Sequence, residues 1–139
     1  MMKVLKAFFL LLTIMTLTGC LDREIYTEIA DKSIVSHPPA TLQIEDPSGL
    51  FKSTFKTDPA SPIKMSVYIH CAKCTNAQSK SLGSDFDGYI RITLSEDNLT
   101  IARAQMDYKG EATSDEVQQV YDHLMETLQW EDIADTLRK

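Results

Sequence analysis

The chain has 139 residues, with 14 Lys and Arg against 20 Asp and Glu, and its formal net charge is −6. This length suits one domain with one modest hydrophobic core. The acidic balance disfavours binding to nucleic acid and gives no electrostatic attraction to anionic lipid head groups, so we expect no nucleic-acid partner.

The first twenty residues have the pattern of an export signal. Lys3 and Lys6 precede an apolar run of 11 residues, AFFLLLTIMTL at positions 7–17. A helix needs roughly 20 residues to cross the hydrocarbon core of a bilayer, so this run is too short to span a membrane. It has the length of the apolar region of a secretory signal peptide, and it leads into the sequence LTGC at positions 17–20.

These four residues, Leu17, Thr18, Gly19 and Cys20, resemble the lipobox of bacterial lipoproteins. The resemblance implies removal of residues 1–19 as a signal peptide, diacylglycerol modification of the Cys20 thiol, and often acylation of the new amine by a chain such as palmitate. Two or three acyl chains hold a protein stably at a membrane, since each buried CH₂ contributes about 0.8 kcal/mol. Leu21 follows the cysteine in place of the aspartate typical of inner-membrane retention, so the resemblance favours the outer membrane. The alternatives are a secreted protein in which Cys20 is incidental and an N-terminal helix that belongs to the core.

Residues 20–40 are interpreted as a lipidated tether and residues 41–139 as a single domain. The tether contains a short amphipathic piece with Ile25 and Ile29 on one side, and it ends at Pro38 and Pro39, which stop a helix. A short helix near the membrane and a flexible stalk both fit this pattern. Without the two lysines of the signal peptide, 12 basic residues face 20 acidic ones, a charge of −8, so lipid rather than charge must hold the domain to the membrane.

Three segments predict strands before the middle of the chain. Residues 41–45 alternate, and residues 50–57 place Phe51 four positions before Phe55, a spacing that we assign to a strand rather than a helix. Residues 63–71 alternate without exception, as in a strand with one buried face. The expected inward residues there are Ile63, Met65, Val67, Ile69 and Cys71, and the outward ones are Lys64, Ser66, Tyr68 and His70.

Residues 86–108 predict a β-hairpin. Pairing Leu94 with Thr100 leaves a three-residue turn, Glu96-Asp97-Asn98, with Asn98 in the left-handed position. A slip by one residue would expose half of the apolar set, so the pattern selects this register. The face expected to be apolar comprises Phe86, Ile90, Ile92, Leu94, Ala102, Ala104, Met106 and Tyr108.

A helix is predicted from Thr113 to about Trp130. Thr113 and Glu116 match a capping box. An apolar stripe at helical spacing follows: Val117, Val120, Tyr121, Leu124 and Leu128. The fold class is therefore α+β, with a small antiparallel sheet of four to five strands and a C-terminal helix packed on one face.

Cys71 and Cys74 form the motif with the clearest chemistry, CAKC. We favour a structural disulfide, because two cysteines remain after Cys20 is lipidated and an oxidising compartment pairs them. A thiol-redox centre is a second reading, although the polar segment after Cys74 makes a poor helix to lower a thiol pKa. A metal site is a third, but His70 and Cys71 point to opposite faces of their strand, and no second pair of ligands closes a tetrahedral site.

No catalytic constellation, cofactor motif or metal motif stands out, so we expect a non-enzymatic binding or accessory module of the cell envelope, with a protein partner of unknown identity. The alternative is an envelope protein that handles thiols or metals through Cys71 and Cys74. The candidate partner surface mixes aromatic residues and arginine, which are enriched at interfaces. It consists of the outward residues Tyr68, His70, Tyr89, Arg91, Ile101 and Arg103.

Overall fold

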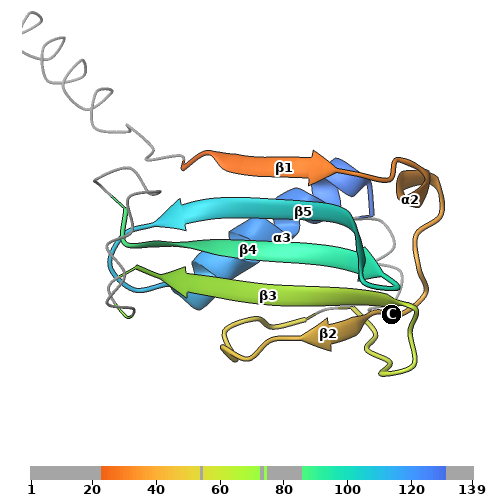
Figure 1. Cartoon of the computed structure of the whole chain (residues 1–139), viewed down its shortest axis with the longest axis horizontal. Coiled ribbons are helices and arrows are strands. Elements are labelled where there is room, and N and C mark those ends of the chain that lie inside the picture. The colour runs from red at the N-terminus through yellow and green to blue at the C-terminus, as the bar shows by residue number, and fades with distance from the viewer. Residues whose placement is uncertain (1–22, 54, 73, 75–85, 131–139) are drawn as a thin grey trace, which may run out of the picture.

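Figure 1 shows the computed structural model of the chain, which describes residues 23–53, 55–72, 74 and 86–130. The predicted signal peptide, Cys20 and residues 131–139 lie outside this described part. One mostly antiparallel sheet carries a C-terminal helix across one face, and no described element covers the other, which we call the open face (Figure 1). The predicted α+β class is confirmed.

The sheet has five strands in the order β1-β5-β4-β3-β2. The strands are β1 (Ile25–Ile29), β2 (Gln43–Glu45), β3 (Ile63–Cys71), β4 (Gly88–Glu96) and β5 (Leu99–Tyr108). Only β2 runs parallel to its neighbour, β3; the other pairs are antiparallel. The helices among the described residues are the short α2 (Ser33–Ser36) and the long α3 (Ser114–Leu128).

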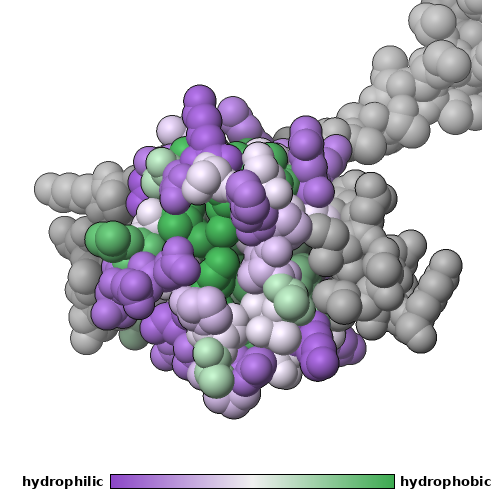
Figure 2. All heavy atoms as spheres, turned by 90° about the vertical axis from the view of Figure 1, so that its right-hand side faces the viewer, coloured by the Kyte–Doolittle hydropathy of each residue, from purple (hydrophilic) through white to green (hydrophobic). Residues whose placement is uncertain are grey.

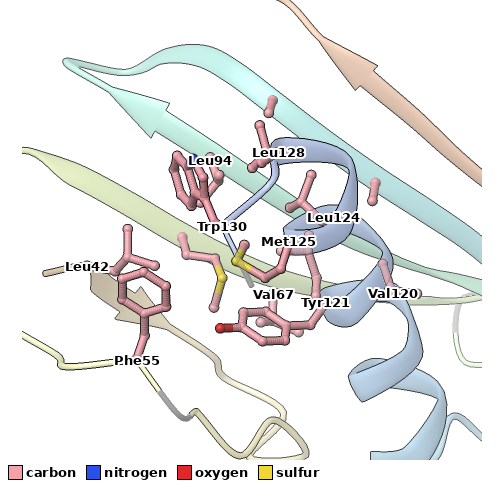
Figure 3. Packing of buried hydrophobic residues seen from close by; sticks show 14 of the residues in the cluster. Leu42, Phe55, Val67, Leu94, Val120, Tyr121, Leu124, Met125, Leu128 and Trp130 are labelled. Carbon is pink, nitrogen blue, oxygen red and sulfur yellow. The ribbon is translucent and has the colours of Figure 1, made fainter. Parts of the chain in front are cut away.

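The core lies between α3 and the inner face of the sheet. Alternate residues of β3, β4 and β5 turn toward the helix, as period-two patterning requires. Figure 3 shows side chains from α3, the sheet and the loop around Phe55 meeting in this core. Its fully enclosed members include Leu42, Met65, Ile90, Ile92, Leu94, Met106, Val117, Val120, Leu124, Leu128 and Trp130.

Both ends of α3 are fixed by specific contacts. The Thr113 side chain accepts a hydrogen bond from the Glu116 N–H, and the Glu116 carboxylate accepts one from the Thr113 N–H, so the predicted capping box is confirmed. Gln129 ends the helix in a left-handed conformation with φ 59°. Trp130 is then fully buried, and its indole N–H donates to the Ile34 carbonyl at 3.3 Å, which ties the end of α3 to α2.

The prediction that residues 20–40 are a tether is wrong from Arg23 onward. Residues 25–29 form edge strand β1, with Ile25 opposite Met106 and Ile29 opposite Ala102 on β5. Arg23 also forms an ion pair with Glu116 of α3. The spacing of the two isoleucines fits one face of a strand as well as one face of a helix, which is why the sequence pattern did not reveal the strand.

The predicted hairpin register is wrong by two residues. Asp97 and Asn98 both have positive φ, 49° and 66°, so the turn has two residues rather than three. This turn places Glu96 opposite Leu99 and would by itself put Leu94 opposite Ile101. A bulge leaves Ile101 without a partner on β4, so Leu94 instead lies opposite Ala102. A slip of two residues leaves a side chain on the same face, so the paired residues of β4 and β5 keep their predicted faces. Two expectations fail: Ile101 turns into the core, and Phe86, expected inward, precedes β4, is half-buried and does not belong to the core cluster.

The described residues of the segment 50–57 do not form the predicted strand, and Thr57 makes only an isolated parallel bridge to Leu42. They belong to a loop in which the Asp46 carboxylate accepts hydrogen bonds from the Ser48 and Phe51 N–H groups. The loop instead delivers aromatic rings to the core: Phe51 lies 4.8 Å from the ring of Tyr121, measured between centroids, and Phe55 lies 6.4 Å from Trp130. Both phenylalanines therefore face the core, although neither lies in a strand or a helix.

Candidate functional site

The open face of the sheet, opposite α3, brings together most of the predicted partner surface. On β3 and β4, Tyr68 lies opposite Arg91 and His70 lies opposite Tyr89. These four outward side chains occupy two adjacent rows of two neighbouring strands. We call them the Tyr–Arg block.

Tyr89 is the centre of the Tyr–Arg block. The His70 ring stacks on it with centroids 4.9 Å apart and planes 25° apart, and the Tyr68 ring lies 6.0 Å away. The guanidinium carbon of Arg91 lies 4.9 Å from the Tyr89 centroid. Aromatic pairs contribute about 0.5–1.5 kcal/mol beyond area burial, and an exposed cation–π contact about 0.5–1 kcal/mol. The block therefore holds its side chains in place while half of Tyr68 (51%) stays exposed.

Two residues that the sequence analysis missed extend the block across β5 and β1. Gln105 lies opposite Arg91, and its Oε1 accepts hydrogen bonds from Arg91 Nε at 2.9 Å and Nη2 at 2.7 Å. Tyr26 lies opposite Gln105 and is 68% exposed. Alternation along β5 places Gln105 on the same face as Arg103, so that residue was within reach of sequence reasoning. Tyr26 was not, because its strand had been assigned to the tether.

The two arginines of the open face differ in their partners. Arg103 forms an ion pair with Glu28 at 2.6 Å, and both side chains are about half exposed, so the pair adds little stability. Arg91 has no ion pair with a carboxylate in the part of the chain that the structure describes. A guanidinium has five N–H donors, and two bonds to Gln105 leave Arg91 with donors to offer a carboxylate or carbonyl. Arg91 is therefore the cation of this face that is suited to an external acceptor.

Ile101, predicted to point outward, does not belong to this face. It is the extra residue of the β4–β5 bulge, and only 5% of it is exposed because it joins the core cluster. Strict alternation from Arg103 would have put Ile101 outward, but a bulge shifts the alternation by one residue.

Cys71 and Cys74 form a disulfide at the end of β3. The Cys74 N–H donates to the Cys71 carbonyl at 3.2 Å, so the motif is a tight turn with Cys74 exposed. A helix after Cys74 would favour a redox centre over a structural disulfide. Residues 75–85, where such a helix would lie, are outside the described part. Among the described residues, no three His, Cys, Asp or Glu side chains gather as a metal site.

Two further observations bear on assignment. No helix in the described part of the chain is both long and apolar enough to cross a membrane. The chain matches no protein-family model, no curated protein and no solved structure in the three comparisons made.

Proposed function

We propose that the protein is a lipid-anchored, non-enzymatic binding module of a bacterial cell envelope, held at the outer membrane through Cys20, and that the Tyr–Arg block contacts a partner protein. The observation that carries the binding role is the block itself, in which Tyr68, His70 and Arg91 surround Tyr89 on an exposed sheet face. The lipobox resemblance supports the anchor and the address.

The segment between Cys20 and the folded domain is short. Arg23 is already tied to Glu116 of α3, so only Leu21 and Asp22 separate Cys20 from the folded domain. Three residue steps of extended chain reach at most about 11 Å. A lipidated Cys20 would therefore hold the domain against the membrane surface rather than on a long stalk, with the start of β1 nearest the lipid (Figure 1).

Binding is favoured over simple solvation of this face by the residue types and their rigidity. Tyr and Arg are enriched among residues that dominate interface energies, whereas solvated surfaces rely on Lys and Glu. The block stands on the middle strand β4 and its neighbour β3, and its rings are fixed by contacts with each other. Side chains that are already ordered lose less conformational entropy when a partner binds.

The alternative proposal is an envelope thiol-redox or metal-handling role for Cys71 and Cys74. Its supporting feature is that Cys74 is an exposed residue in a turn at the end of β3, close in the chain to His70. The turn follows a strand rather than opening a described helix, which gives less support to a low thiol pKa.

Two experiments on the full-length protein test the proposal. Cys20→Ser should abolish incorporation of labelled palmitate. Continued incorporation would rule out Cys20 as the lipidated residue. A photo-crosslinking amino acid at Tyr68 should give a discrete adduct in intact envelopes, and Tyr89→Ala should remove it. The matched control carries the crosslinker at Glu126, which is exposed on α3 away from the open face. Identical adducts at both positions would refute the partner surface.

A further inference from the structure

A hollow lies at the end of the sheet opposite the anchor. It occupies about 260 Å³ between the end of β1 and the β4–β5 turn. Leu99 and Ile101 supply its apolar wall, and Asp31, Glu96 and Asp97 stand around it. Figure 2 looks onto this end and shows apolar surface gathered between polar side chains.

The walls of the hollow are fixed by the backbone. The Ile101 carbonyl, in the bulge, accepts hydrogen bonds from the N–H groups of Ala30 at 2.9 Å and Asp31 at 3.1 Å. The Asp31 carboxylate in turn accepts bonds from the side chain and the N–H of Ser33, which lower its pKa, so it is ionised at neutral pH. Asp97 is held by the two-residue turn. The hollow is thus formed before any ligand arrives.

Its apolar and charged groups are both unmatched within the described chain. Leu99 is 73% exposed, the largest exposure among the big apolar side chains that the structure describes. None of Asp31, Glu96 and Asp97 forms an ion pair with a described residue. Lys32 follows Asp31 in the sequence, but its single positive charge does not balance the three acidic residues, so the rim is negative.

We infer that this hollow binds an apolar side chain carried by a positively charged segment of another envelope protein. The negative rim complements such a segment and repels anionic lipid and nucleic acid. The volume lies below the roughly 300–1,000 Å³ of sites for drug-sized ligands, and it suits a single anchoring side chain. The inference deepens the proposed binding function and rests on it only for the orientation, which points the hollow away from the membrane.

The test titrates defined peptides into the full-length, isotope-labelled protein in a nonionic detergent, read by amide chemical shifts. The probe is acetyl-Lys-Lys-Leu-Phe-Lys-Lys-amide. The controls replace every Lys by Glu, or replace Leu-Phe by Ser-Ser. We expect the probe to shift the amides of Asp31, Leu99 and Ile101, and both controls to bind about tenfold more weakly or less.

Charge-neutralising variants locate the site. Glu96→Gln combined with Asp97→Asn should weaken the probe about tenfold, as should Leu99→Ser, and higher salt should weaken it further. The matched control, Asp115→Asn with Glu126→Gln, removes the same charge from exposed positions of α3 and should leave binding unchanged.

Three outcomes overturn the inference. They are equal binding of the acidic peptide, equal weakening by the α3 control pair, and a photo-crosslinker at Leu99 that captures only a second copy of this chain. Tyr89→Ala, on the open face, should leave the probe affinity unchanged. The peptide titration is therefore independent of the crosslinking at Tyr68 and of the lipidation test. Failure of either of those experiments does not change its outcome, and failure of the titration does not change theirs.

Discussion

The phenol of Tyr108 on β5 donates a hydrogen bond of 2.9 Å to the main-chain carbonyl of His70 on β3, across the intervening strand β4. The residue beneath this bond is Gly88, which lies opposite both Tyr108 and Cys71. The contact joins two strands that are not neighbours, at the sheet end that carries the disulfide and the His70 side of the Tyr–Arg block.

Tyr108→Phe should lower the free energy of unfolding by about 0.5–1.5 kcal/mol at pH 7, the usual worth of a hydrogen bond. Burial, then the charges of Asp87 and Glu116, raise the pKa of the Tyr108 phenol in the folded protein. The unfolded chain therefore loses this proton first as pH rises, so the contribution of Tyr108 is complete below about pH 10 and is lost above it. Urea unfolding from pH 7 to 11 should show the wild type declining toward the variant, and a constant difference would contradict this account.

Gly88→Ala should destabilise the protein by about 1–3 kcal/mol or more, as overpacking of a tight site does. A Cβ at Gly88 would lie 1.9 Å from the His70 carbonyl oxygen and 2.5 Å from the Tyr108 hydroxyl oxygen. Urea unfolding measures the loss. Adding Tyr108→Leu should recover only part of it, because the main-chain carbonyl of His70 remains in place. Wild-type stability in the single variant would mean that β3 and β4 lie further apart than observed.

Leu124→Ala should cost about 2–5 kcal/mol, because Leu124 is fully buried midway along α3 and the helix depends on packing for its stability. The matched control is His123→Ala, one position away and only half-buried, which should change the free energy of unfolding by less than about 0.5 kcal/mol. Both are measured by urea unfolding. Small and equal effects would show that α3 does not dock on the sheet.

Replacing both Cys71 and Cys74 by Ser should lower the stability by about 2 kcal/mol, the loop-entropy value for so short a ring. The adduct formed from Tyr68 should persist at a permissive temperature, because the bond in this interpretation is structural. A reduction potential well above about −300 mV, or loss of function without loss of stability, would favour the redox alternative.

The sequence predicted the features that rest on periodicity. The strand 63–71, the capping box at Thr113 and the stripe of α3 appear as expected. The apolar face of the hairpin also appears as expected, except at Phe86 and Ile101. Of the six residues predicted for the partner surface, four form one block and Arg103 lies on the same face, because alternation decides which face a strand residue occupies. The sixth, Ile101, turns into the core at the bulge.

What the sequence left undetermined depends on contacts between distant segments. The strand character of residues 25–29 comes from pairing with β5, and an isolated pair of isoleucines carries no sign of it. The bulge at Ile101 arises only because a two-residue turn and the apolar pattern demand different registers. The hollow beside Leu99 combines both of these features, so it was invisible before the sheet was assembled.

The two-residue turn gives the last prediction, since it sets the hairpin register. Asn98 has φ 66°, a left-handed conformation that asparagine tolerates and that costs alanine roughly 1–2 kcal/mol. Asn98→Ala should therefore lower the free energy of unfolding by about 1 kcal/mol, whereas Asn98→Gly should stay within about 0.5 kcal/mol of wild type. Gln119→Ala, exposed on α3, is the matched control and should be neutral.

The register itself is read from contacts between Hα protons of facing residues by nuclear Overhauser effects. Leu94 should show contacts to the Ala102 region, as the bulged pairing requires. Contacts from Leu94 to Thr100, together with no effect of Asn98→Ala on stability, would support the three-residue turn predicted from the sequence. The bulge would then disappear, Ile101 would return to the open face, and the hollow would lose its apolar wall.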